Sequence, residues 1–348
     1  MKNKLLMGFL LLFALFGFTR LTSVAAADNG ANFTIAPVYP SNQTDKALGY
    51  FRLETPADYK GQLQVTVANL DEQKTRTFRV SPVAATTSDE GQINYTPSSA
   101  KPDPSAQYVL TQFLSKPVTV TLEPRTQKTV TFEYRIPKKG FKGTLLGSIY
   151  VLDTTASDQK TKGFALKNRF AMALGVSMSM DVKHMMAPDL KLGAIKASTR
   201  QNKPIVAARL RNVKPSYFRK MSVTTKITKA GQTRRLYQGK LTGGSMAPNS
   251  NFEFATPTKG KVIPAGRYRY DMTVKATGRT WHFTKYFTIS RAQHNKLANK
   301  NGEKPASNWW YWLIALLLLL LLILVGWLFY LLGKRRREEE DDDEEQGR

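Results

Sequence analysis

The residue types that most often do chemistry are scarce in this chain, and their spacing favours neither catalysis nor metal binding. Its three histidines, His184, His282 and His294, lie far apart, and there is no cysteine to join them. Zinc sites need several such ligands at short and regular spacings. We therefore predict no metal centre and no cofactor, and we interpret each histidine as a structural or exposed residue.

One short stretch matches a catalytic pattern. Ser157 and Lys160 have the spacing of the Ser-x-x-Lys motif of penicillin-recognising enzymes. This stretch is a polar linker without the helix and the companion motifs that the reaction requires, so we interpret the match as chance. A pair of carboxylates for glycan hydrolysis leaves no local signature, and hydrolysis therefore stays open as an alternative.

Aromatic and amide side chains gather near residue 40 and suit the binding of a glycan. The candidate ligand-binding residues are Tyr39, Asn42, Gln43 and Tyr50. Aromatic faces stack on sugar rings, and amides hydrogen-bond to sugar hydroxyls. The alternative is a structural turn beside a core aromatic residue, and both interpretations stay open.

Charge is divided unevenly along the chain. Residues 28–162 hold 16 basic and 13 acidic side chains, whereas residues 163–308 hold 28 and 5. The resulting net charge of +23 on the second segment exceeds what solubility requires, and it favours an anionic partner.

The basic residues of the second segment mostly alternate with apolar ones, so strands would place them on one face. We expect this face to contact the anionic partner. Its candidate residues are Arg209, Arg211, Arg219, Lys220, Arg234, Arg235, Arg267 and Arg269.

Short strands must position all of these residues. Apolar and polar residues alternate from Asn32 onward, as in Leu63, Val65 and Val67, and turn residues recur about every ten positions. The pattern predicts an all-β fold with two tandem immunoglobulin-like β-sandwiches, followed by one C-terminal transmembrane helix.

The two sandwiches are expected at residues 28–162 and 163–289, and we expect the first to fold by itself. Residues 86–108 are rich in Ser, Pro and Asp, which indicates a long loop or excursion between strands.

The two ends of the chain predict export and anchoring. Residues 1–27 have the basic start, the apolar run and the small-residue end of a signal peptide. Residues 309–332 are uncharged and long enough to span a membrane as a helix. A polar stalk is expected at 290–308 and a charged cytoplasmic tail at 333–348, because the basic cluster after the helix stays inside. The sandwiches then lie outside the cell, where nucleic acid is not a physiological partner.

Several stretches resemble the WxL-interacting proteins of Gram-positive cell surfaces. The opening Phe33-Thr-Ile-Ala-Pro37, the strand Gln64-Val-Thr-Val-Ala-Asn69 and the strand Gly147-Ser-Ile-Tyr150 carry the resemblance. Further matches are the Gly91-Gln-Ile-Asn-Tyr95 turn and Leu122-Glu-Pro124. The sequence departs from the family where Lys60 replaces a proline and where Arg52 stands at a position that is commonly acidic.

The resemblance implies a non-catalytic scaffold or adhesin at the cell surface. Its first module would bind peptidoglycan or another wall polymer, and its second would bind WxL-domain proteins, host extracellular matrix, or both. The alternatives are a cell-wall-modifying enzyme, which needs a clustered acid pair in a cleft, and a membrane-bound sensor, against which the short tail argues.

Overall fold

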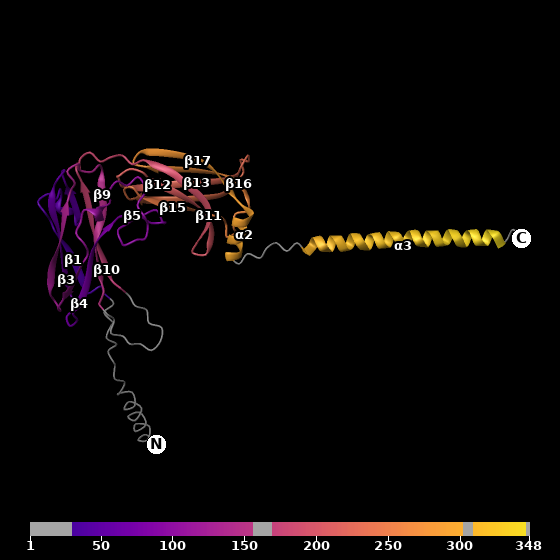
Figure 1. The fold of residues 1–348 in the computed structure, drawn as a ribbon, viewed down its shortest axis with the longest axis horizontal. Coiled ribbons are helices and arrows are strands. Elements are labelled where there is room, and N and C mark those ends of the chain that lie inside the picture. The colour runs from indigo at the N-terminus through magenta and orange to yellow at the C-terminus, as the bar shows by residue number, and fades with distance from the viewer. Residues whose placement is uncertain (1–29, 156–168, 302–308, 346–348) are drawn as a thin grey trace, which may run out of the picture.

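Alternating strands build two β-sandwiches in the computed structural model, which describes residues 30–155, 169–301 and 309–345 (Figure 1). The strands of the two sandwiches run crosswise to one another in Figure 1. The predicted all-β fold of two tandem immunoglobulin-like sandwiches, followed by an apolar helix, is confirmed. The predicted signal peptide and the Ser157–Lys160 motif lie outside the described residues.

The first sandwich consists of a three-stranded sheet packed against a five-stranded sheet in the described part of the chain. The smaller sheet has the order β1 (Phe33–Val38), β3 (Lys60–Asn69), β8 (Gln127–Arg135). The larger has the order β2 (Phe51–Glu54), β10 (Ala171–Ser179), β9 (Thr144–Asp153), β4 (Arg76–Ala84), β7 (Val118–Leu122). Short 3-10 turns lie at Lys46–Leu48 and Leu110–Gln112.

The core of the first sandwich follows the alternation in the sequence. Leu63, Val65 and Val67 are fully buried along β3, and their neighbours on β8, Val130 and Phe132, pack into the same core. Burial of alternate positions is what a strand with one face on the core requires.

Strand β10 belongs to the first sandwich, although the boundary expected at 162/163 assigns it to the second module. It pairs antiparallel with β9 and parallel with β2, and Leu174, Val176 and Met178 complete the first core. A fragment that ends at residue 162 lacks this central strand. We therefore propose that the independently folding unit extends to Ser179, beyond the expected end at residue 162.

The second sandwich packs a three-stranded sheet on a four-stranded one within the described residues. The first sheet has the order β11 (Leu190–Arg200), β12 (Lys203–Asn212), β15 (Asn251–Pro257). The second has the order β14 (Arg235–Met246), β13 (Phe218–Lys229), β16 (Gly266–Ala276), β17 (Arg279–Ile289).

Residues 85–108 of the first sandwich, which we call the excursion, reach across to the second sandwich. The excursion carries the short strands β5 (Thr86–Thr87) and β6 (Ile93–Asn94). Its tip at Gly91 has a φ of +70°, and a Cβ added there would lie 2.6 Å from Leu241 Cδ2. Glycine therefore allows the tip to seat against the second sandwich.

Buried polar contacts fasten the excursion at this junction. Arg211 donates from Nε and Nη2 to the two carboxylate oxygens of Asp103, at 2.7 and 2.8 Å, and Asp103 is 1% exposed. Thr87 Oγ1 lies 2.5 Å from Ser250 Oγ, and the Ala247 amide donates to the same threonine. The excursion is therefore an inter-module clamp rather than a free loop.

Two helices follow the sandwiches. Helix α2 (Arg291–Lys300) begins with a capping box between Ser290 and Gln293 and packs on the second sandwich, where Ala298 is buried. The first part of the expected stalk is thus a docked helix. Helix α3 (Trp309–Glu345) contains the apolar stretch Tyr311–Tyr330, long enough to cross a membrane and not buried against the described protein. It continues through part of the expected charged tail.

Candidate functional site

An open groove of about 870 Å³ lies on the first sandwich, beside the smaller sheet. It is lined by residues of β1, β3 and β8 and of the connections after β1 and after the 3-10 turn Leu110–Gln112, including Tyr39, Tyr59, Lys60, Phe113 and Tyr134. A second groove of about 520 Å³ shares Ser41 and Tyr59 with it, and we call the two together the tyrosine groove.

Aromatic contacts shape the tyrosine groove. The rings of Tyr59 and Tyr134 stack with their centroids 6.0 Å apart, and Tyr39 packs edge-on against Phe51 at 6.1 Å. A Cβ at Gly61 would lie 2.5 Å from the Tyr134 hydroxyl oxygen, so only glycine leaves room for this pair. Burial raises the pKa of Tyr134 to about 12, and the hydroxyl accepts a hydrogen bond from Asn42 Nδ2 at 3.1 Å.

The structure brings together three of the four predicted glycan-binding residues. Tyr39 lines the larger part of the tyrosine groove, and Asn42 and Gln43 line the smaller part. Tyr50 lies against Gly175 of β10 and lines neither part.

The two amide side chains also hold the local turn. Gln43 Nε2 donates to the carbonyls of Asp45 and Tyr50, at 2.6 and 3.0 Å, and its Oε1 accepts from the Arg52 amide at 2.9 Å. Gln43 is therefore committed to the backbone. Asn42 Nδ2 is bonded to Tyr134 and to the Glu54 carbonyl, but its Oδ1 has no partner within the described residues. A buried acceptor without a partner is costly.

Sequence reasoning missed Tyr59, Tyr134, Phe113, Lys60 and Arg135, all of which line the groove. The alternation of β8 assigns Tyr134 to the core, and nothing in the local sequence indicates that its hydroxyl reaches a groove. The Tyr59-Lys60-Gly61 turn is the one local signal, since it sets an aromatic ring and a cation beside a glycine.

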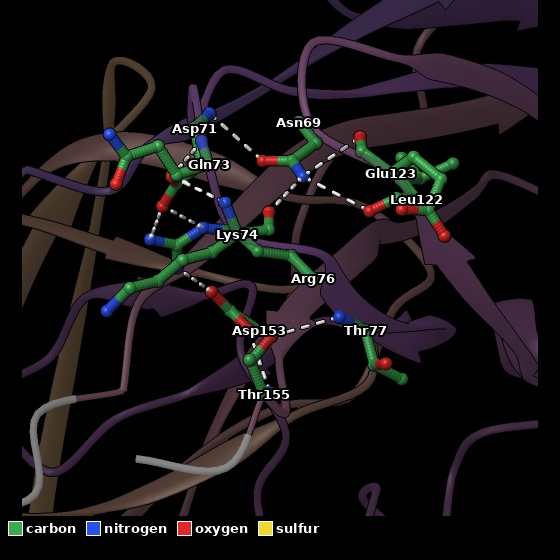
Figure 2. Close-up of polar contacts among 10 residues, drawn as sticks. All are labelled: Asn69, Asp71, Gln73, Lys74, Arg76, Thr77, Leu122, Glu123, Asp153 and Thr155. Carbon is green, nitrogen blue, oxygen red and sulfur yellow. Dashed lines mark hydrogen bonds and ion pairs between the residues drawn. The ribbon is translucent and has the colours of Figure 1, made fainter. Parts of the chain in front are cut away.

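The carboxylates of the first sandwich are arranged for structure. Figure 2 shows Arg76 between Asp71 and Asp153, with ion-pair distances of 2.7 and 2.6 Å. Hydrogen bonding, chiefly from the Gln73 amide, lowers the pKa of Asp71 to about 2. Asn69, 1% exposed, donates to the carbonyls of Lys74, Leu122 and Glu123 in the same network (Figure 2).

A glycosidase needs one carboxyl group that stays protonated near neutral pH. Asp71 does not meet this need, because hydrogen bonds, chiefly from the Gln73 amide, hold its pKa at about 2. Within the described residues, Glu133 is the only carboxylate that lines the larger part of the tyrosine groove, and Glu54 is the only one in the smaller part.

Some of the predicted basic residues of the second sandwich are held by contacts within the fold, and the others are exposed without an ion pair in the described residues. Arg209 pairs with Glu253 and Arg269 with Asp271, whereas Arg211 is held in the junction by Asp103. Arg219 is also at the junction, where it partly offsets the rise that burial causes in the pKa of Tyr95. Lys220, Arg234, Arg235 and Arg267 are exposed and form no ion pair within the described ranges.

Arg211 thus does not belong to a free anion-binding face. Burial alone would raise the pKa of Asp103, but hydrogen bonds from Arg211 and Ser105 outweigh it and lower that pKa below its usual range. The pair is a structural contact between modules.

The similar solved structures are distant in sequence. A chaperone–tip adhesin complex of CFA/I fimbriae is 10% identical, with 73% of this chain and 99% of that chain covered and a TM-score of 0.30. The CsuC–CsuE chaperone–tip adhesion complex of Acinetobacter baumannii is 11% identical over 65% and 90%, with a TM-score of 0.29. A Porphyromonas gingivalis W83 protein of unknown function is 14% identical over 74% and 100%, with a TM-score of 0.23. No curated protein matches the chain.

Two family models match the chain in succession and together cover most of it. The WxL Interacting Protein peptidoglycan binding domain matches residues 33–153, and the WxL Interacting Protein host binding domain matches residues 161–299. Both are binding domains, and their order agrees with the resemblance noted in the sequence. The chain belongs to the WxL Interacting Protein family, with its peptidoglycan binding domain first and its host binding domain second.

Proposed function

We propose that this protein is a non-catalytic scaffold of the cell surface, anchored in the membrane by α3. Its first sandwich binds peptidoglycan, and its second recruits WxL-domain proteins, host matrix components, or both. The basic cluster Lys334–Arg337 after the apolar stretch keeps the C-terminal end inside the cell, so both sandwiches face the wall.

The tyrosine groove is the observation that supports wall binding. Its aromatic rings offer stacking faces to sugar, and Lys60 and Arg135 lie on the same rim, where they can pair with the carboxylates of the peptide stems. Because the groove is open, a polymer strand can lie along it.

Peptidoglycan sedimentation with a soluble fragment of residues 30–301 tests this role. We expect Tyr59→Ala to weaken binding about tenfold, which is about 1.4 kcal/mol, through loss of a stacking face. Tyr286→Ala is the matched control, since Tyr286 is an exposed tyrosine on β17 of the other sandwich. Equal binding by Tyr59→Ala and the unaltered fragment, with the fold intact, would contradict the groove as the wall site.

Capture from intact cell envelopes tests recruitment. The same fragment is expected to retain a WxL-domain protein. Tyr59→Ala, which should weaken peptidoglycan binding, should retain that protein equally, because the partner site is assigned to the second sandwich. Release of muropeptides during the incubation would instead favour the enzyme alternative.

A further inference from the structure

The outer face of the sheet β14-β13-β16-β17 carries cations in a regular cross-strand pattern. Alternate residues such as Val223, Ile227 and Tyr270 point into the second core, so their neighbours face outward. Register places three rows of residues side by side on successive strands, and every member except the buried Thr228 is at least partly exposed. These rows are Lys240, Thr224, Thr273 and His282; then Gln238, Lys226, Asp271 and Thr284; then Arg235, Thr228, Arg269 and Tyr286.

Four basic residues of these rows, together with Arg267 two positions before Arg269 on β16, form a band that we call the cationic track. Successive rows are about 7 Å apart along a strand, and neighbouring strands are about 4.8 Å apart. The track runs from β14 across β13 to β16. Its members are Lys240, Lys226, Arg235, Arg269 and Arg267, and all are exposed.

The track is poor in counter-charge. Asp271 is the only acidic residue in the three rows, and its Oδ1 already accepts hydrogen bonds from Arg269 at 2.9 Å and from Thr284 at 2.7 Å. Among the described residues, Lys226, Arg235 and Lys240 have no ion pair. Like charges held this close together are unfavourable without an anion between them.

A groove of about 640 Å³ lies in the track and is lined by Lys226, Arg235 and Lys240, with Asp271 and with Ala255 and Pro257 of β15. Gly239 lets β14 pack closely on the core beside it, because a Cβ there would lie 2.8 Å from Thr225 Oγ1 and 2.9 Å from Phe254 Cε1. The three cations thus surround a depression rather than extend separately into solvent.

The residues between the cations indicate what kind of polyanion fits. Thr224, Thr273 and Gln238 line the groove and can hydrogen-bond to sugar hydroxyls. At the end of the track, the Tyr286 ring is 52% exposed and lies under the Arg267 guanidinium at 5.4 Å, which offers an aromatic face beside a cation. A polyphosphate would use only the cations, whereas a sulfated sugar chain would use all three kinds of side chain.

We propose that the cationic track binds a sulfated polysaccharide, with sulfate groups on Lys226, Arg235 and Lys240 and sugar hydroxyls on the intervening threonines and glutamine. The proposal rests on the proposed function, since it names a ligand class for the host-binding sandwich. It does not involve the tyrosine groove or α3.

The test measures the affinity of the full chain, in a nonionic detergent, for immobilised heparin over a salt series. The track variant changes Lys226, Arg235 and Lys240 to Gln. The matched control changes Lys191, Lys203 and Lys296 to Gln, which removes the same charge from exposed residues of β11, β12 and α2. We expect the track variant to bind at least about tenfold more weakly and the control less than about twofold.

Two further probes identify the ligand chemistry. Desulfated heparin should bind far more weakly than heparin if sulfate is recognised, and inorganic polyphosphate of similar charge should also bind more weakly if the sugar contacts contribute. Equal loss in the track and control variants, or equal affinity for heparin and polyphosphate, would show that only diffuse charge acts and would overturn the proposal.

Peptidoglycan sedimentation with the same preparations separates this inference from the proposed function. If the chain binds peptidoglycan and captures its partner but does not bind heparin, the cationic track alone is overturned. Loss of peptidoglycan binding in the unaltered chain would count against the scaffold itself.

Discussion

Replacing Asp103 by Ala should loosen the junction between the two sandwiches. The Asp103 side chain is fully buried and Arg211 is 30% exposed, so the change leaves a partly buried guanidinium without its carboxylate. It also removes the acceptor of the Ser105 amide. Breaking a buried pair costs about 3–5 kcal/mol, and water can reach part of Arg211, so we expect a loss of about 2 kcal/mol.

Thermal unfolding of residues 30–301 measures this loss. For a unit of this size each kcal/mol lowers the Tm by about 2–4 °C, so Asp103→Ala should lower it by about 4–8 °C. Asp103→Asn keeps the shape and an acceptor, and should cost about half as much. A double-mutant cycle with Arg211→Met should give a coupling energy of about 1–2 kcal/mol.

The exposed pair of Arg125 and Glu72 is the matched control. Both side chains are more than half exposed, so Glu72→Ala should change stability by less than about 0.5 kcal/mol. A coupling energy near zero between Asp103 and Arg211, or an unchanged Tm in Asp103→Ala, would refute the junction as a stabilising contact. Arg211 would then be available to an external anion, as the sequence alone suggested.

Three other outcomes are expected. The pKa of Asp71 lies at about 2 in the folded chain and at 3.8 in the reference state, so its contribution is complete above about pH 4 and is lost as the pH falls toward 2. Thermal unfolding between pH 4 and 2 should therefore be less pH-dependent in Asp71→Asn than in the unaltered fragment. Val65→Asp should unfold the first sandwich by circular dichroism, because an unpaired charge replaces a fully buried residue, whereas Thr66→Asp on the opposite face should leave it folded. Deleting residues 309–348 should release the protein into the medium, and equally firm attachment of the truncated protein would identify the tyrosine groove as the main anchor.

The strands of both sandwiches could be predicted from the sequence because their alternation is local. Val65 and Phe132 are buried where the pattern places them. The same pattern cannot say which sheet a strand joins, since β10 would be amphipathic in either sandwich. Its parallel pairing with β2 depends on residues more than a hundred positions away.

The roles of Arg211 and of the stalk were harder to predict for different reasons. Asp103 is 108 positions from Arg211 in the sequence. A count of charged residues therefore cannot show that Arg211 is paired within the fold. The sequence predicts a polar stalk at 290–308, although Ser290 and Gln293 have the spacing of a capping box. In the structure this segment begins with a helix, and His294 contacts the Ile263 carbonyl of the second sandwich. The local sequence can predict a strand or a helix, whereas the residues that it packs against depend on the whole fold.

The position of β10 in the larger sheet has a consequence for how the protein matures. A chain secreted from its N-terminus emerges with β9 before β10, and the parallel edge of β2 has no partner until residues near Ser179 have crossed the membrane. Until then β2 and β9 each expose unpaired backbone groups along the edge that β10 will occupy, and these groups can pair with another chain. The first sandwich should therefore stay open to extracytoplasmic folding factors, and to mispairing, for the time needed to translocate the stretch between β9 and β10.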